Sequence, residues 1–527
     1  MGVKYRRLIM VLIAVALIVI PTLVALPVWQ ASGTEQNKAP VTGMQTVPDG
    51  TEDDLDGFAT NLPIVIMDVG GKALHVHSVW DNASGHYLPV DYDPHVGGTL
   101  AIIDTGTGVN RLSDPRAEVT TMKARMRGSS SQTFPKPQYA ITLVNGDGAD
   151  SAKDMLGMGT SANWVLNVSF LDKSLLRNYL AYTVAAQVMA HTPKARYCEL
   201  FFADHGTFQY QGVYLLMQSI EAGASMVPLA PYDARHAEAA YLLRRDRYRP
   251  GAIMLNTYGT VNQLTDEYLE VRYPGAGAIT PATIDYITTD VSAFEKALFA
   301  PDDKTYLTYR DYVDVNSFVD YFVLNEFFAN YDAALHSMYM YHDLGGKLTM
   351  GPVWDFDRAI DNDYPRSLKV DSTAMDHGVW FAEVLRDGDF VKQVLDRYHQ
   401  LRKGVLSDAS LDALIDRTVS YLGTAQVRDW NRWNYNGVYD EQFVHEVPID
   451  QRPLTKNRLD YAGTVAELTA TLHDHGAWMD AHLDSLYQFS TIRPGQYATD
   501  YSWILSALAV VLVVAFFTTV HLAQRER

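Results

Sequence analysis

The order of the predicted elements indicates an α+β fold with a transmembrane helix at each end. From Leu62 onward the chain reads as strands, a helix, strands, a long helix, short strands and then helices. A doubly wound sheet would instead alternate strand and helix regularly. Uncharged apolar segments stand near both termini, and each is long enough to cross a bilayer.

Strands dominate the first part of this region. Four runs are rich in β-branched residues or alternate between apolar and polar residues, and each ends in glycine: Leu62–Gly71, Gly97–Gly108, Val119–Gly128 and Gln138–Gly148. The last two are predicted to pair with each other. Farther on, Arg196–Ala203 and Tyr210–Ile220 are predicted to form another antiparallel pair.

Helical periodicity follows in three places. Leu171–Ala190 carries an apolar face at helical spacing, with Asp172 as its predicted N-cap. Val315–Asn330 has a second apolar stripe, and beyond Phe381 the chain is mostly helical. Residues 386–500 are therefore predicted to form a helical C-terminal extension.

The apolar segments at 8–29 and 501–522 are predicted to be transmembrane helices. Basic residues precede the first and follow the second: Lys4, Arg6, Arg7, Arg525 and Arg527. By the positive-inside tendency, the tails 1–7 and 523–527 are cytoplasmic, and the main domain lies outside the cell membrane. The alternative for the first segment is a cleaved signal peptide, since a basic start and an apolar stretch fit this too. Residues 30–57, rich in Gly, Pro, Thr and acidic residues, are predicted to be a linker.

The composition excludes some classes of function. The 527 residues are 47% hydrophobic and 20% charged, which is typical of a globular protein. The net charge of -19 argues against a nucleic-acid partner. The single cysteine, Cys198, rules out an intramolecular disulfide, and its apolar neighbours favour an inert core thiol. An extracytoplasmic protein without disulfides favours a bacterial or archaeal surface.

Three clusters of polar residues have a pattern suited to chemistry. The turn Arg127–Ser131, between two predicted strands, can offer backbone N–H groups to phosphate, with Lys136 as a point charge. Asp332 follows a long helix, where a loop carboxylate can act as a general base. Asp355 and Asp357 stand two apart, so they lie on the same side if this segment is a strand, and both can then face one hard cation such as Mg²⁺.

Each cluster also has an ordinary structural interpretation. The turn fits a Ser/Gly hairpin loop, and Asp332 fits a helix C-terminal cap. The paired aspartates fit a buried salt bridge with Arg358 or Arg366. The order of the clusters along the chain, however, is the order of parts in kinase-type phosphoryl transfer. The residues alone point no further than a metal-dependent phosphotransferase.

Six segments of the chain resemble the CotH family, named for a spore-coat protein and described as atypical and kinase-like. They follow one another between Leu62 and Phe381: LPIVIM, KARMRGSSSQTFPKPQYAITL, NWVLNVSFLDKSLLRNYLAY, YQGVYLLMQSI, FVDYFVLNEFFANYDAALHSMYMYHD and GKLTMGPVWDFDRAIDN. The W-D-F-D box after a Gly-Pro turn is the most specific. The resemblance implies that residues 58–385 form an atypical protein-kinase-like core with antiparallel strands and helices.

The resemblance further implies transfer of the γ-phosphoryl group of ATP to Ser or Thr residues of a protein substrate, with Mg²⁺ or Mn²⁺. Lys136 corresponds to the lysine that contacts the nucleotide phosphates. Arg127 and Ser129 belong to the phosphate-facing turn. Asp332 corresponds to the residue that accepts the proton of the attacking hydroxyl.

A metal site is implied in the same way. Asp355 corresponds to the metal-binding aspartate, with Asp357 assisting. Ser337 stands where ordinary kinases place a second metal-binding asparagine, and Gln218 stands where the family usually has glutamate. Both departures leave room for a protein that is kinase-like but catalytically weak or inactive.

Three functions remain as expectations. The first is a membrane-anchored protein kinase acting on Ser or Thr of proteins at the cell surface or in export. The second is a non-catalytic, kinase-like scaffold or adhesin at the cell surface. The third is a carbohydrate-active enzyme, suggested by the aromatic residues Trp430, Trp433 and Tyr435. The retained Lys136 and the aspartates favour the first.

Overall fold

The computed structural model of the chain describes residues 55, 57–168, 170–362, 370–433 and 460–497. Nearly all of them belong to one compact unit, Ala31–Ile492. A second unit comprises Met1–Gln30 and Arg493–Arg527, of which residues 493–497 are described. The site is built entirely within the first unit.

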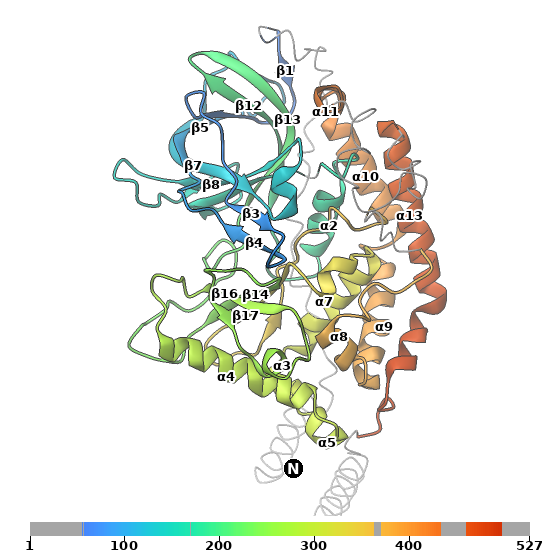
Figure 1. The fold of residues 1–527 in the computed structure, drawn as a ribbon. Helices are drawn as coiled ribbons and strands as arrows, with labels where there is room; N and C mark the ends of the chain where they lie inside the picture. Colours follow the sequence, from blue (N-terminus) through green and yellow to red (C-terminus); the bar gives the residue numbers. More distant parts are fainter. Residues whose placement is uncertain (1–54, 56, 169, 363–369, 434–459, 498–527) are drawn as a thin grey trace, which may run out of the picture. The chain divides into compact units, whose positions relative to one another are not determined.

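Seven strands of the first unit close into a barrel (Figure 1). Their bounds are β2 (Ile64–Asp68), β5 (Val96–Ile103), β7 (Glu118–Arg127), β8 (Gln138–Leu143), β11 (Asn163–Asn167), β12 (Ala195–Asp204) and β13 (Thr207–Gln218). The order around the barrel is β11-β13-β12-β2-β5-β7-β8. Neighbouring strands are antiparallel except β12 and β2, which are parallel. The predicted pairs, β7 with β8 and β12 with β13, are confirmed.

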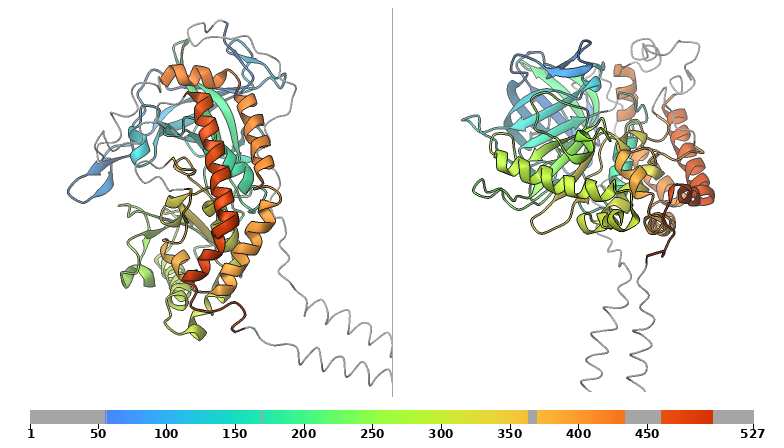
Figure 2. Two further views of the ribbon diagram at one scale, coloured as in Figure 1. Left: turned by 90° about the vertical axis from the view of Figure 1, so that its right-hand side faces the viewer. Right: turned by 60° about the horizontal axis from the view of Figure 1, so that its bottom comes forward.

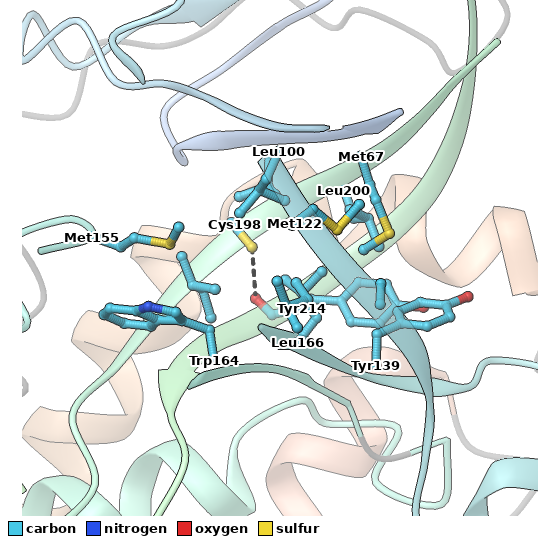
Figure 3. Packing of buried hydrophobic residues seen from close by; sticks show 14 of the residues in the cluster. Met67, Leu100, Met122, Tyr139, Met155, Trp164, Leu166, Cys198, Leu200 and Tyr214 are labelled. Carbon is cyan, nitrogen blue, oxygen red and sulfur yellow. Dashed lines mark hydrogen bonds between the residues drawn. The ribbon is translucent and has the colours of Figure 1, made fainter. Parts of the chain in front are cut away.

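The interior of the barrel is a continuous apolar core. On β7, Met122 and Ala124 are buried while Lys123 between them is exposed, because successive side chains of a strand point to opposite faces. Cys198 lies in this core, and its Sγ donates to the Tyr214 carbonyl oxygen at 3.6 Å (Figure 3). Burial raises the pKa of this thiol far above its usual range. The predicted inert core thiol is confirmed.

A second sheet has five strands. They are β14 (Tyr241–Asp246), β15 (Met254–Leu255), β16 (Tyr268–Tyr273), β17 (Met338–His342) and β18 (Thr349–Met350). All pairs are antiparallel, in the order β15-β16-β14-β17-β18. Helix α4 (Pro281–Leu298) runs along this sheet, and Tyr241 Oη donates to Asp290 Oδ2 on it at 2.5 Å (Figure 1).

A short hairpin of β3 (Ser78–Asp81) and β4 (His86–Pro89) lies where the barrel and the second sheet approach each other (Figure 1). Its contacts reach both sides. Gln132 Nε2, from the turn after β7, donates to the Ser78 carbonyl oxygen at 2.8 Å. On the other side, the rings of His86 and Tyr248 have centroids 5.4 Å apart.

Helices form the rest of the unit. α7 (Val315–Phe327) begins at Asp314, whose side chain accepts from the backbone N–H groups of Asn316 and Ser317, and it is buried from Phe318 onward. The helix predicted at 315–330 is thus confirmed and ends three residues earlier. α9 (Gly388–Arg402) packs on α7, and α13 (Tyr461–His482) packs on α7 and on α10 (Asp408–Leu422), as Figure 2 shows for the long α13. The predicted helical region beyond Phe381 is confirmed for the described residues.

The remaining elements are short. The helices are α2 (Arg177–Ala185), α3 (Tyr258–Val261), α5 (Asp303–Tyr306), α6 (Tyr309–Tyr312), α8 (Val379–Val384) and α11 (Ala425–Trp433). The 3-10 turns are η1 (Ser130–Thr133), η2 (Tyr331–Ala334) and η4 (Leu483–Phe489). The strands are β1 (Ala59–Thr60), β6 (Asn110–Arg111), β9 (Lys153–Asp154) and β10 (Thr160–Ser161).

The predicted fold class is corrected in its strand core. We expected antiparallel strands of the kinase type, whereas β8 pairs with β11 to close a barrel that contains one parallel pair. The fold is therefore a mixed α+β fold with a closed seven-stranded barrel. Alternation within one strand predicts its buried face but not its neighbour, so closure was not readable from the sequence.

The predicted transmembrane helices are also corrected. No helix among the described residues is both long enough and apolar enough to cross a membrane. The 22-residue α13, for example, carries Glu467, Asp474 and Asp480. The predicted spans, 8–29 and 501–522, lie outside the described residues. Two flanking transmembrane helices are thus not supported, and the predicted cell-membrane localisation, with an extracytoplasmic main domain and cytoplasmic termini, is withdrawn.

Candidate active site

The W-D-F-D box, Trp354–Asp357, follows β18 and bends at its first aspartate. Asp355 has a φ of 69° and Ser337 a φ of 52°, in the left-handed region that residues other than glycine rarely adopt. Ser337 Oγ donates to Asp355 Oδ2 at 3.1 Å. Two strained residues therefore face each other, and such strain clusters at functional sites.

Side chains from two helical segments hold the backbone of the box. Tyr182 Oη on α2 accepts from Asp355 N at 3.3 Å, and Asn178 Oδ1 accepts from Phe356 N at 2.8 Å. After α7, Asn330 Nδ2 donates to the Asp355 carbonyl oxygen at 3.3 Å. The strained position of Asp355 is thus set by the tertiary structure.

A chain of amide side chains links the box to the barrel. Arg127 Nη1 and Asn167 Nδ2 both donate to Gln138 Oε1 at 3.0 Å. Asn178 Nδ2 then donates to Asn167 Oδ1 at 3.1 Å. The Arg127 guanidinium also lies 4.9 Å from the centre of the Trp354 ring. Because buried polar groups require partners, this network fixes Arg127 beside the box.

Three aspartates and one arginine act on one another at the box. Burial, and next the charge of Asp332, raise the pKa of Asp355 above its usual range. Arg127 and hydrogen bonds from Ser337 and Asp357 oppose this shift. Carboxylates that disfavour each other's charge are stabilised when a cation binds among them.

The residues at the box fit a divalent cation. Among the described residues, no group of three or more His, Cys, Asp or Glu side chains is placed to hold a metal ion. Mg²⁺, however, is usually held by one or two carboxylates, with waters and substrate phosphates completing the octahedron. Asp355 and Asp357 form such a pair. Asn330 adds an oxygen, since its buried Oδ1 has no hydrogen-bond partner in the described part of the chain.

Asp332 lies in η2, the turn that follows α7. Its carbonyl oxygen accepts from the backbone N–H groups of Leu335 at 3.0 Å and His336 at 2.8 Å. Its carboxylate is half-buried and makes no hydrogen bond or ion pair with any described residue. A carboxylate whose lone pairs are unoccupied, on a turn fixed by its backbone, can accept a proton from a substrate hydroxyl.

Lys136 makes its polar contacts at a different place. Its Nζ lies 2.5 Å from Asp429 Oδ1 on α11 and donates to the Val213 carbonyl oxygen at 2.9 Å. The same carboxylate oxygen accepts from Val213 N at 2.7 Å. The lysine side chain is 0% exposed. Lys136 thus fastens α11 to β13, much as protein kinases pair a strand lysine with a helix glutamate.

The structure places some of the predicted site residues at the box and others, such as Lys136, elsewhere. Those that act on one another at the box are Arg127, Asp332, Ser337, Asp355 and Asp357. Ser129 is exposed at the start of η1. Arg366, considered as a salt-bridge partner, lies outside the described residues.

Sequence reasoning missed the residues that support the box. Arg177 pairs with Asp172 at 2.7 Å and donates through Nε to the Ala359 carbonyl oxygen at 3.0 Å. Asp172 is therefore not the N-cap of α2, which is Leu176. Arg177 and Asn178 are polar residues on a helix whose residues are all buried. Buried polar residues need fixed hydrogen-bond partners. Two adjacent polar residues at the start of an otherwise apolar helix are visible in the sequence and could have indicated this role.

The tryptophans considered as a sugar-stacking surface are used in packing. Trp430 is 9% exposed and packs against Phe170. Trp433 Nε1 donates to the Gln211 carbonyl oxygen at 3.1 Å. Tyr435 lies outside the described residues. Both described tryptophans therefore make contacts within the protein, and these contacts do not support the prediction of a sugar-stacking surface.

Residues 373–378 are held to the end of α7 and to the turn that carries Asp332. Glu326, near the end of α7, accepts from the backbone N–H groups of Ala374 and Met375, each at 2.9 Å. The rings of His377 and Tyr331 stack with centroids 3.7 Å apart. Burial raises the pKa of Glu326 from 4.5 to about 8.

Glu326 is expected to make stability depend on pH. Between 4.5 and about 8 the folded chain retains a proton that the unfolded chain has lost, so the free energy of unfolding falls as pH rises. We expect Glu326→Gln to flatten this decline by several kcal/mol, since each pKa unit corresponds to about 1.4 kcal/mol. Urea denaturation of both proteins across this interval measures it. Parallel curves would assign the decline to other groups.

Comparison with known families is consistent with this geometry. A family model described as CotH kinase protein matches residues 124–455, more than half of the chain. The matched range contains Arg127, Asp332 and Asp355 as well as the Lys136–Asp429 pair. A search of the curated proteins found no match to this chain.

Proposed function

Because the chain belongs to the CotH kinase family, we propose that it is a protein kinase that transfers the γ-phosphoryl group of ATP to Ser or Thr residues of a protein substrate. The arrangement at the box carries this proposal: Ser337 Oγ donates to Asp355 Oδ2 at 3.1 Å, and the Arg127 guanidinium lies 4.9 Å from the centre of the Trp354 ring. The charge of Asp332 also acts on Asp355. Phosphoryl transfer requires a general base, a carboxylate that can bind a metal ion and a positively charged side chain near the phosphates, and Asp332, Asp355 and Arg127 can supply these.

Each residue has one task in this proposal. Asp355 and Asp357, with Ser337 beside them, would hold Mg²⁺ or Mn²⁺, which when bound neutralises charge on the phosphates. The Ser or Thr oxygen forms a bond to the γ-phosphorus while the bond to the bridging oxygen breaks and ADP leaves. Asp332 accepts the hydroxyl proton. Arg127 is placed to stabilise negative charge on the transferred group.

Neither departure from the kinase pattern disrupts this arrangement. Ser337 lies 3.1 Å from Asp355 Oδ2 through its hydroxyl oxygen. Gln218, at the end of β13, donates to Ser225 Oγ at 3.2 Å, a residue outside the box. The substitution of glutamate by Gln218 therefore removes no charge from the contacts made by Asp355. These observations support an active kinase over a non-catalytic scaffold.

The test is incorporation of labelled phosphate. The full-length chain is incubated with radiolabelled ATP, Mg²⁺ or Mn²⁺, and a mixture of Ser- and Thr-containing peptides. We expect phosphate on the chain or on the peptides, lost when a chelator removes the cation. The double variant Asp332→Asn/Asp355→Asn defines the background. Equal incorporation by the double variant would contradict the proposal, and no incorporation together with no ATP-induced rise in melting temperature would favour the scaffold.

A further inference from the structure

Five arginines gather where the barrel approaches the second sheet: Arg125, Arg127, Arg244, Arg249 and Arg272. The first two lie two positions apart at the end of β7, on the face opposite the buried Met122 and Ala124. The others come from β14, the turn after it, and β16 (Figure 1). We call this group the arginine cluster.

One glutamate, Glu270, forms ion pairs with all three arginines of the second sheet. Glu270 accepts from Arg244 Nη2 at 2.7 Å and from Arg272 Nη1 at 2.9 Å, and it also pairs with Arg249. Asp246 is a second partner of Arg244, at 3.4 Å. These ion pairs can serve the fold alone and by themselves indicate no ligand.

The two barrel arginines differ, because neither has a carboxylate within ion-pair distance among the described residues. Arg125 Nη1 donates to the carbonyl oxygen of Met126 at 2.9 Å, and Arg127 donates to the amide oxygen of Gln138. Both side chains are partly buried. Partly buried cations that form no close ion pair are unfavourable, and they stand out in a chain whose net charge is -19.

Repulsion within the arginine cluster contributes to low pKa values for Arg125 and for the neighbouring His77. Burial, and next Arg127, Arg249 and Arg272, lower the pKa of Arg125 to about 10. Burial, and next Arg125 and Arg249, lower the pKa of His77 to about 4, so that the imidazole stays neutral beside the arginines. An anion bound among these groups would relieve the repulsion.

We propose that the arginine cluster binds a chain of phosphate groups that extends from Asp355 past Arg127 toward Arg249 and Arg272. Guanidinium groups bind phosphate through paired hydrogen bonds and keep their charge when desolvated. The side chains of Arg249 and Arg272 are each 37% exposed, so a ligand can reach them, whereas that of Lys136 is fully buried.

This site deepens the proposed function and rests on it for the direction of the phosphate chain. Two sources share the chemistry: the triphosphate of the nucleotide, and phosphate groups already present on the acceptor protein. In both cases Arg127, which acts on Asp355, would lie at the reacting end.

The first experiment measures binding of inorganic tripolyphosphate to the full-length chain by calorimetry, with a chelator present. We expect binding that weakens with added salt. Arg125→Gln and Arg249→Gln should each lower the affinity by about 10-fold, the usual effect of losing a charged hydrogen bond. The control Arg235→Gln, at a side chain that is 84% exposed, should bind like the wild type. Equal affinity of all variants would overturn the proposal.

A conservative variant separates binding from folding. Arg249→Lys keeps the charge but not the paired donors, so it should recover part of the affinity lost in Arg249→Gln while melting near the wild-type temperature. If Arg249→Gln is unstable, Arg249→Lys is compared with the wild type directly. Undiminished affinity in a folded Arg249→Lys would then count against paired phosphate contacts.

Competition distinguishes the two sources. Displacement of tripolyphosphate by ADP assigns the arginine cluster to the nucleotide, and displacement by a multiply phosphorylated peptide but not by ADP assigns it to the acceptor. Displacement by neither overturns the link to the active site. Phosphate transfer is measured separately. Arginine-dependent binding without transfer would contradict the proposed function but support the phosphate site. Transfer without tripolyphosphate binding would support the proposed function but contradict the phosphate site.

Discussion

Replacing Asp332 by asparagine is expected to lower the rate of phosphate incorporation by about 100- to 10,000-fold while nucleotide binding is nearly unchanged. Asparagine has the shape of aspartate but cannot take the proton of the attacking hydroxyl. The Asp332 carboxylate makes no hydrogen bond or ion pair with the described residues, so the fold does not depend on it. Rates, and the rise in melting temperature with ATP and Mg²⁺, are measured on the same preparation.

Asp355→Asn is the matched comparison. It is expected to lower the rate as well, but it should also remove the Mg²⁺-dependent part of the ATP-induced rise in melting temperature, because Asp355 is the proposed metal ligand. Asp332→Asn should keep that part. If Asp332→Asn lowers the rate by less than about 10-fold, the loss is smaller than the usual effect of removing a general base, and the assignment of Asp332 is contradicted.

Replacing Lys136 by methionine is expected to lower the free energy of unfolding by about 3–5 kcal/mol. The side chains of Lys136 and Asp429 are 0% and 1% exposed, and their charged atoms lie 2.5 Å apart. Removing the ammonium leaves a carboxylate charge buried between α11 and β13 without its cation. Urea denaturation measures the loss, which should appear even if the lysine also contacts a phosphate.

Two further variants make this result specific. Lys136→Met combined with Asp429→Asn should regain part of the stability, because no buried charge remains and the asparagine oxygen can still accept from Val213 N. The control Lys392→Met removes an exposed pair with Asp396, at a side chain that is 57% exposed, and should change stability by less than about 1 kcal/mol. A similarly small effect for Lys136→Met would mean that its pair is not structural.

Local pattern was enough to predict most elements around the site. The period-two alternation of Val119–Gly128 predicted β7, and the apolar stripe from Val315 predicted α7. The two signals arise from neighbours within one element, which the sequence displays directly. They place Asp332 after a helix and Asp355 after a strand, and the fold then brings both carboxylates to one site.

Contacts between distant segments were not predictable in this way. The Lys136–Asp429 pair joins residues 293 positions apart. It forms because α11 packs across β13, which no periodicity of either segment encodes. Likewise, Arg244 meets Glu270 only because β14 pairs with β16 in the register that sets them opposite each other.

The sequence by itself determined the strands and helices that flank the site, the inert Cys198 and the order of the turn, the base and the box. Only the tertiary structure decided that the strands close into a barrel, that Lys136 is paired with α11, and that arginines of the barrel lie near arginines of the second sheet. The physical reason is that period and propensity act within a segment. Burial and charge pairing act between segments, and they depend on which faces meet.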